Sequence, residues 1–306
     1  MFLTLLAHTQ PRTSDGTADA HQEELDPKVN AIVARDEEGA RAAALEADRT
    51  VSRGEPLGRL HGVPVTIKDS LEVAGMRTTG GSARWGMHVS TSDAESVARL
   101  KNDGAIVFGK SNMPPDARDW QTYNDVYGTT NNPWDPTRGP GGSSGGSAAA
   151  LAAGLTGLAL GGDSAGSIRV PAHFCDVYGL RTSSGIVPRY GSVSGHAPGT
   201  LADFDVAVLG PLGRHADNLA LGLDILAGAT TTAPRLGGWS CPPPGRPLCG
   251  AFGSRHGSKT RSAPSTASWP RSCRRRWKRC GPRVPSWSRA RDRSGSKKRW
   301  LSMNRC

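Results

Sequence analysis

The sequence changes character near residue 235, and this break limits what the chain can fold into. Residues 235–306 contain 19 Lys and Arg side chains and a single acid, Asp292, so their net charge is +18. Leu, Ile, Val and Phe together account for only five of these 72 residues. Such a segment buries too little apolar surface to offset the entropy lost on ordering. We therefore predict that residues 235–306 are a disordered basic tail.

Three interpretations of this tail are open. The first is a basic arm, centred on residues 274–279, that binds a membrane surface or binds nucleic acid without specificity. The second is a metal site, but no two cysteines have Cys-x-x-Cys spacing, so we expect no metal. The third, which we favour, is out-of-frame translation of a GC-rich coding sequence, because no helical or strand period appears. The cysteines concerned are Cys241, Cys249, Cys273, Cys280 and Cys306.

The first 234 residues have the opposite charge, because they hold 19 of the chain's 38 basic residues and 26 of its 27 acidic ones. Their length is sufficient for one large domain. No run of 18 apolar residues occurs, so we expect no membrane-spanning helix. The first residues lack the basic start of a signal peptide, which favours a cytoplasmic protein. We predict an irregular segment over residues 1–24 and a folded domain over residues 25–234.

Strand and helix patterns alternate along this domain, which predicts an α/β fold. Short apolar runs indicate the strands, and apolar spacing with terminal caps indicates the helices. One helix is expected between a capping box at residues 92–95 and Gly104. The predicted strands are residues 62–68, 105–108 and 155–160, and the other predicted helices are residues 31–53, 143–153 and 215–227.

Two short motifs match familiar patterns. Residues 104–111 fit the P-loop spacing, but residues 105–108 are apolar and β-prone, so a sheet needs the N–H groups that would otherwise bind phosphate. We therefore reject nucleotide binding. Residues 162–166 fit G-x-S-x-G, the turn that carries the nucleophile of α/β-hydrolases. An esterase that uses Ser164 is the rival catalytic class, although no HGGG-type loop precedes it.

Three further polar features consist of residue types that nucleophilic catalysis can use. Lys68 ends a predicted strand, and Ser167 ends a glycine-rich turn. Ser143 and Ser144 lie in the glycine-rich segment 140–147. A serine hydroxyl needs a base, and a buried lysine can be that base because desolvation lowers its pKa. A second serine can relay the proton, since a hydroxyl both donates and accepts.

With these features in this order, the sequence resembles the amidase signature family over about residues 25–228. The resemblance implies a central mixed β-sheet covered by helices on both faces. It also implies hydrolysis of carboxamide C–N bonds through an acyl-enzyme, with release of ammonia or an amine and no cofactor. The substrate is then a small amide. The matching motifs are residues 62–69, 105–114, 119–124, 128–135 and 139–175.

The family's Lys–cis-Ser–Ser triad falls on Lys68, Ser143 and Ser167. The resemblance implies that Ser167 is the nucleophile, Ser143 the relay on a cis peptide bond, and Lys68 the base. It also implies an oxyanion hole made of backbone N–H groups. Those groups belong to Ser164, Ala165, Gly166 and Ser167, with Ser144, Asp163 and Arg169 in supporting positions. We expect Asp163 and Arg169 to form an ion pair that holds the loop.

The sequence departs from the family pattern in several ways, and two of them bear on activity. Ala165 stands where the family usually has glycine, so its methyl group would crowd the oxyanion pocket if this residue needed a positive φ. Family members are also substantially longer, and an inactive chain is therefore the alternative to an active one. Residues 114–124 resemble the stand-alone amidases more than the amidotransferase component that frees ammonia from glutamine. A homodimer is compatible with the sequence.

Overall fold

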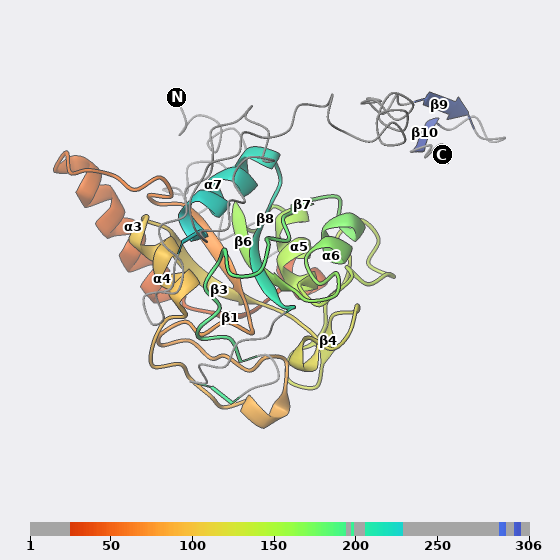
Figure 1. Cartoon of the computed structure of the whole chain (residues 1–306), viewed down its shortest axis with the longest axis horizontal. Helices are drawn as coiled ribbons and strands as arrows, with labels where there is room; N and C mark the ends of the chain where they lie inside the picture. The colour runs from red at the N-terminus through yellow and green to blue at the C-terminus, as the bar shows by residue number, and fades with distance from the viewer. Residues whose placement is uncertain (1–24, 194–196, 199–205, 229–287, 292–296, 301–306) are drawn as a thin grey trace, which may run out of the picture. The chain divides into compact units, whose positions relative to one another are not determined.

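The computed structural model describes residues 25–193, 197–198, 206–228, 288–291 and 297–300 (Figure 1). The chain divides into two compact units, Met1–Cys241 and Pro242–Cys306. The predicted irregular segment 1–24 and most of the predicted basic tail lie outside the described residues. In the second unit, strands β9 (Ser288–Arg291) and β10 (Lys297–Trp300) pair antiparallel. The disorder expected over residues 235–306 as a whole stays a prediction.

A six-stranded sheet forms the centre of the first unit, and it is mixed, as the family resemblance implies. Its strand order is β1-β3-β2-β6-β8-β7. Strand β2 pairs parallel with β3 and β6, and the other pairings are antiparallel. The strands are β1 (Ile32–Arg35), β2 (Pro64–Lys68), β3 (Ile106–Ser111), β6 (Leu158–Asp163), β7 (Tyr178–Gly179) and β8 (Val208–Gly213). A separate hairpin joins β4 (Tyr123–Asn124) to β5 (Gly128–Thr129).

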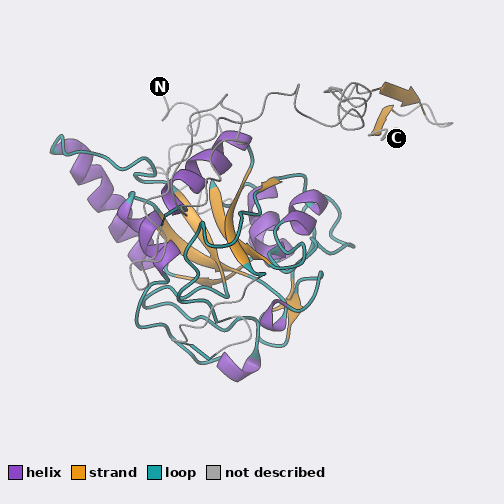
Figure 2. Ribbon diagram, viewed as in Figure 1, coloured by secondary structure: helices purple, strands orange, loops and turns teal. Residues whose placement is uncertain are grey.

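Helices cover both faces of this sheet (Figures 1 and 2). One apolar cluster packs α4 (Glu95–Asn102) and α7 (Ala216–Leu226) against side chains of β2, β3 and β6. A second cluster packs α5 (Gly145–Ala152) and α6 (Arg169–Phe174) against the opposite face. The described residues also contain α3 (Glu37–Ser52) and the 3-10 turns η2 (Ala83–Trp85) and η3 (Pro115–Ala117), and residues 25–29 are helical too. Among the described residues, no helix has the length and apolar character that a membrane span requires.

Two predicted elements are wrong in detail. Residues 31–53 do not form one helix, because Ile32 and Arg35 pair with β3 in strand β1. The helix begins after Asp36, whose carboxylate accepts a hydrogen bond from the Gly39 N–H at 2.9 Å. The capping box at 92–95 is also absent, since the N-cap of α4 is Ala94 and makes no side-chain bond. Asp93 instead binds Lys101 at 2.7 Å.

The strand predicted over residues 105–108 extends to Ser111. Thr66 pairs with Gly109, and Lys68 pairs with Ser111, so the P-loop-like residues belong to the sheet. Helix α5 consists mostly of small residues, which allows it to pack close to the sheet. A Cβ on Gly146 would lie 2.4 Å from the Asn112 backbone nitrogen, so only glycine lets the helix approach the end of β3 this closely.

Candidate active site

The candidate residues converge at one edge of the sheet. Strands β2 and β6 are parallel, so their carboxyl ends meet there, and Lys68 and Asp163 are their last residues. Ser143 lies just before α5, on the face of the sheet that α5 covers. Three segments distant in sequence therefore meet around the Lys68 side chain.

Lys68 and Ser143 are in direct contact. The Lys68 ammonium nitrogen, Nζ, lies 2.6 Å from Ser143 Oγ and 3.5 Å from the Gly162 carbonyl oxygen. The peptide bond between Gly142 and Ser143 is cis. Lys68 is only 1% exposed, and this burial lowers its pKa to about 7, against an opposing effect of Asp163. A lysine in this state is neutral for part of the time near neutral pH and can accept a proton.

Ser144 holds the Ser143 segment beside Ser167. The Ser144 backbone N–H donates to the Ser167 carbonyl at 3.0 Å. Its hydroxyl donates to the Gly162 carbonyl at 3.2 Å. A Cβ on Gly161 would come within 2.9 Å of Ser144 Oγ, so glycine is needed at that strand position. Ser143, Ser144 and Ser167 are all buried.

The Asp163 carboxylate organises the turn that contains Ser167. It accepts hydrogen bonds from the N–H groups of Gly166 at 2.8 Å and Ile168 at 3.1 Å. It also forms the predicted ion pair with Arg169, with Nε 3.0 Å from Oδ2, and Arg181 Nε lies 3.5 Å away. Burial raises the pKa of this carboxyl, but the bonds from Arg169 and the backbone outweigh it and hold the pKa at about 2. Asp163 is therefore ionised at neutral pH.

The turn 164–167 accommodates Ala165. Gly166 has φ +112, whereas Ala165 is not among the non-glycine residues with positive φ. The Ala165 methyl group therefore causes no strain from a positive φ, which was the difficulty expected from the sequence. The Gly166 N–H is bonded to Asp163, and no acceptor among the described residues binds the N–H groups of Ser164, Ala165 and Ser167. Ser164 itself is exposed.

A second buried lysine was not expected from the sequence. Lys110 donates to Thr78 Oγ1 at 2.7 Å, and its Nζ lies 3.5 Å from Asp69 Oδ1. Its strand position pairs with Ile67, the residue before Lys68, so it faces the other side of the sheet from Lys68. Burial lowers the pKa of Lys110 to about 8, and Asp69 opposes this shift. The signal in the sequence is a lysine that follows directly on an apolar strand. The same lysine also fits the P-loop spacing, and that spacing does not indicate burial.

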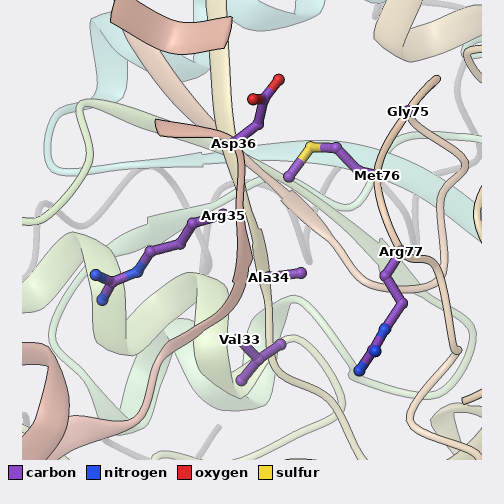
Figure 3. A pocket seen from close by; sticks show the side chains of 7 residues that line it. All are labelled: Val33, Ala34, Arg35, Asp36, Gly75, Met76 and Arg77. Atoms are coloured by element: carbon purple, nitrogen blue, oxygen red, sulfur yellow. The ribbon is translucent and has the colours of Figure 1, made fainter. Parts of the chain in front are cut away.

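One cavity of about 310 Å³ lies between β1 and the loop that contains Met76 (Figure 3). Figure 3 shows that the side chains of Arg35 and Arg77 point in different directions. Arg35 is also paired with Asp26. The cavity therefore lacks a convergent set of charges, and it is separate from the Lys68 site. Its lining residues are Val33, Ala34, Arg35, Asp36, Gly75, Met76 and Arg77.

Comparison with known proteins gives consistent matches. The family model described as Amidase matches residues 19–237. A glutamyl-tRNA(Gln) amidotransferase subunit from Alkaliphilus metalliredigens strain QYMF is 41% identical over 205 residues, which are 67% of this chain and 40% of that protein. The chain thus spans about two fifths of the length of the curated relatives it matches.

Two solved structures extend the comparison. The first is described as part of a vestigial protein complex that reveals the origins of an s-triazine catabolic enzyme. It matches with a TM-score of 0.65 and 39% identity over 74% of this chain and 48% of that one. The second, 6-aminohexanoate cyclic dimer hydrolase with its substrate, has a TM-score of 0.61 and 31% identity over 71% of this chain and 43% of that one.

Proposed function

Because the chain belongs to the amidase family, we propose that it hydrolyses carboxamide C–N bonds and that Ser167 is its nucleophile. The observation that carries this proposal is the 2.6 Å contact between Lys68 Nζ and Ser143 Oγ. It joins a lysine of lowered pKa to a hydroxyl that can relay a proton. The bond from the Ser144 N–H to the Ser167 carbonyl keeps the nucleophile segment next to that relay.

The proposed reaction has two halves. In the first, neutral Lys68 takes the proton of Ser143 while Ser143 takes that of Ser167, and Ser167 Oγ bonds to the amide carbon. The proton then passes to the amide nitrogen as the C–N bond breaks, so ammonia or an amine leaves and an ester remains on Ser167. In the second, water adds to this ester under the same base, and the carboxylate leaves as the Ser167 hydroxyl re-forms.

The oxyanion of the tetrahedral intermediate needs donors that no other acceptor occupies. Gly166 already gives its N–H to Asp163 at 2.8 Å. We therefore assign the oxyanion contacts to Ser164, Ala165 and Ser167 and give Gly166 a holding role. This narrows the set of four donors that the family resemblance implies.

The test measures ammonia released from propionamide and benzamide by the 306-residue chain. We expect Ser167→Ala and Lys68→Met to lose at least about a thousandfold in turnover, because each removes a member of one proton path. Ser164→Ala is the matched control, since its exposed side chain has no part in that path. Loss of activity in Ser164→Ala alone would instead support the α/β-hydrolase-type esterase.

A second candidate is the glutamine-hydrolysing component of an amidotransferase. It is favoured by the 41% identity to proteins that are named as subunits of glutamyl-tRNA(Gln) amidotransferase. The sequence over residues 114–124 favours the stand-alone amidase. L-Glutamine in the same ammonia assay separates the two, because the second candidate requires glutamine to be hydrolysed in preference to propionamide.

A further inference from the structure

Trp120 makes a polar contact with the turn that carries Ser167. Its indole N–H donates to the Ala165 carbonyl, with 3.1 Å between Nε1 and the oxygen. The Trp120 side chain is 57% exposed, so the ring is not placed there by burial in the core. The contact is therefore a specific hydrogen bond to the backbone of residues 164–167.

The backbone around Trp120 is fixed against the segment before Ser143. A Cβ on Gly142 would lie 2.6 Å from the Gln121 carbonyl oxygen and 2.8 Å from that of Asp119, so the two chain segments touch backbone to backbone. Thr122 Oγ1 also donates to the Gly141 carbonyl at 2.8 Å. Trp120 consequently belongs to a segment that packs against the residues before Ser143, and its side chain reaches the turn that contains Ser167.

The peptide unit between Ala165 and Gly166 is held at both of its polar ends. Its carbonyl accepts from Trp120, and its N–H donates to Asp163 Oδ1 at 2.8 Å. Because a peptide unit is planar, two such bonds fix the orientation of its plane. The adjoining N–H groups of Ala165 and Ser167, which we assign to the oxyanion, are thereby restricted in direction.

We propose that Trp120 is a positioning residue that keeps the nucleophile turn, residues 164–167, in register with the Ser143 relay. The inference rests on the proposed function of this site. It assigns to one exposed side chain a second link between the two serine segments, in addition to the bond from the Ser144 N–H to the Ser167 carbonyl. It predicts that loss of the indole N–H loosens the turn and slows the chemical step without weakening substrate binding.

The test compares Trp120→Phe with Trp134→Phe. Trp134 is 65% exposed, and its Nε1 donates to a backbone carbonyl, that of Cys175, at 2.8 Å. The two substitutions thus remove the same kind of bond from similarly accessible tryptophans. Only the first bond reaches the nucleophile turn, so Trp134→Phe controls for the general cost of losing an indole donor.

Two measurements on the full chain decide the proposal. Amide hydrogen exchange followed by mass spectrometry reports the mobility of residues 164–168, and turnover of propionamide and benzamide reports kcat and KM. In Trp120→Phe we expect faster exchange in residues 164–168 and a kcat about tenfold lower, with KM within about twofold of the parent. In Trp134→Phe we expect neither change.

Equal exchange in the two variants across residues 164–168 overturns the proposal, as does an unchanged kcat in Trp120→Phe. A rise in KM with kcat unchanged also overturns it, because that pattern indicates lost substrate binding. If the parent chain hydrolyses no amide and a fluorophosphonate probe does not label Ser167, the proposed function fails. The exchange comparison then still decides whether Trp120 holds the turn.

Discussion

Asp163 and Lys68 are electrostatically coupled at the edge of the sheet: burial lowers the pKa of Lys68 to about 7, and the Asp163 carboxylate opposes that shift. Asp163 itself has a pKa of about 2, because Arg169 and backbone N–H groups stabilise its ionised form against the effect of burial. Across neutral pH the carboxylate therefore keeps its charge while the lysine changes protonation state.

This coupling predicts the pH profile of turnover. Lys68 must be neutral to accept a proton, so we expect kcat/KM to rise with pH, with a midpoint at about 7, and then to level off. Asp163→Asn removes the opposing negative charge, which lowers the Lys68 pKa further and moves the midpoint to lower pH. The profile is measured on propionamide with each protein. A midpoint near the ordinary lysine value of 10.5, or an alkaline shift in Asp163→Asn, contradicts the assignment.

Stability should also depend on pH through the same lysine. Lys68 has a folded-state pKa of about 7 and an ordinary value of 10.5, so between these values the unfolded chain binds a proton that the folded chain lacks. The free energy of unfolding therefore rises with pH across this window. Lys110 adds to the rise above about 8. Urea titrations at several pH values give the slope of the unfolding free energy against pH. Lys68→Met should reduce this slope by the equivalent of about one proton between pH 7 and 10.5. An unchanged slope would show that Lys68 titrates normally.

The buried pair of Lys110 and Asp69 should matter far more than a surface pair. Lys110→Met leaves the Asp69 carboxylate buried without its cation, and we expect a loss of about 3–5 kcal/mol in unfolding free energy. The double variant Lys110→Met/Asp69→Asn should recover part of this loss. Arg138→Ala breaks an exposed pair with Asp135 and should cost at most about 1 kcal/mol. Equal losses for the two single variants would refute the distinction.

The nucleophile turn gives a prediction about two neighbouring positions. Gly166→Ala places a side chain at φ +112, with its Cβ 3.0 Å from Val170 Cγ2, so we expect it to distort the turn and lower kcat at least about tenfold. Ala165→Gly should leave kcat within about threefold, because residue 165 needs no positive φ. Steady-state kinetics on propionamide provides the comparison, and the reverse order of effects would invalidate this description of the turn.

The basic segment 235–306 should bind duplex DNA without sequence preference. Its net charge of +18 predicts an affinity that falls steeply with salt, as counterion release requires. Fluorescence anisotropy with two unrelated duplexes measures both properties, and removal of residues 235–306 should abolish binding. A marked preference for one duplex would instead indicate a selected nucleic-acid site.

The sequence alone predicts the strands and helices whose apolar pattern is clear within the element itself. The apolar run before Lys68 and the leucine spacing of α7 predict elements that the structure contains. Strand β1 was missed because Ala31 and Ile32 read locally as the start of an alanine-rich helix. Their burial against α5, and the pairing of Ile32 with Ser111, depend on residues more than seventy positions away.

In the candidate site, too, the local motifs are predictable from the sequence and the contacts between distant segments are not. Motif resemblance identified Lys68, Ser143 and Ser167, which stay predictions until the variants are measured. The bond between Trp120 and Ala165 and the buried Lys110–Asp69 pair could not be anticipated, because each joins segments whose proximity only the folded sheet creates. The occupation of the Gly166 N–H by Asp163 is likewise a property of turn geometry that composition does not encode.

The parallel pairing of β2 with β6 also has a kinetic consequence. It brings Lys68 to Gly162, 94 positions along the chain, and to Ser143, 75 positions along. Contacts of such long range must close large loops before any favourable energy is gained, so they form slowly during folding. Helices such as α3 can appear within microseconds, whereas the Lys68–Ser143 contact must wait for the sheet. Recovery of turnover after dilution from denaturant would therefore time the closure of the sheet itself.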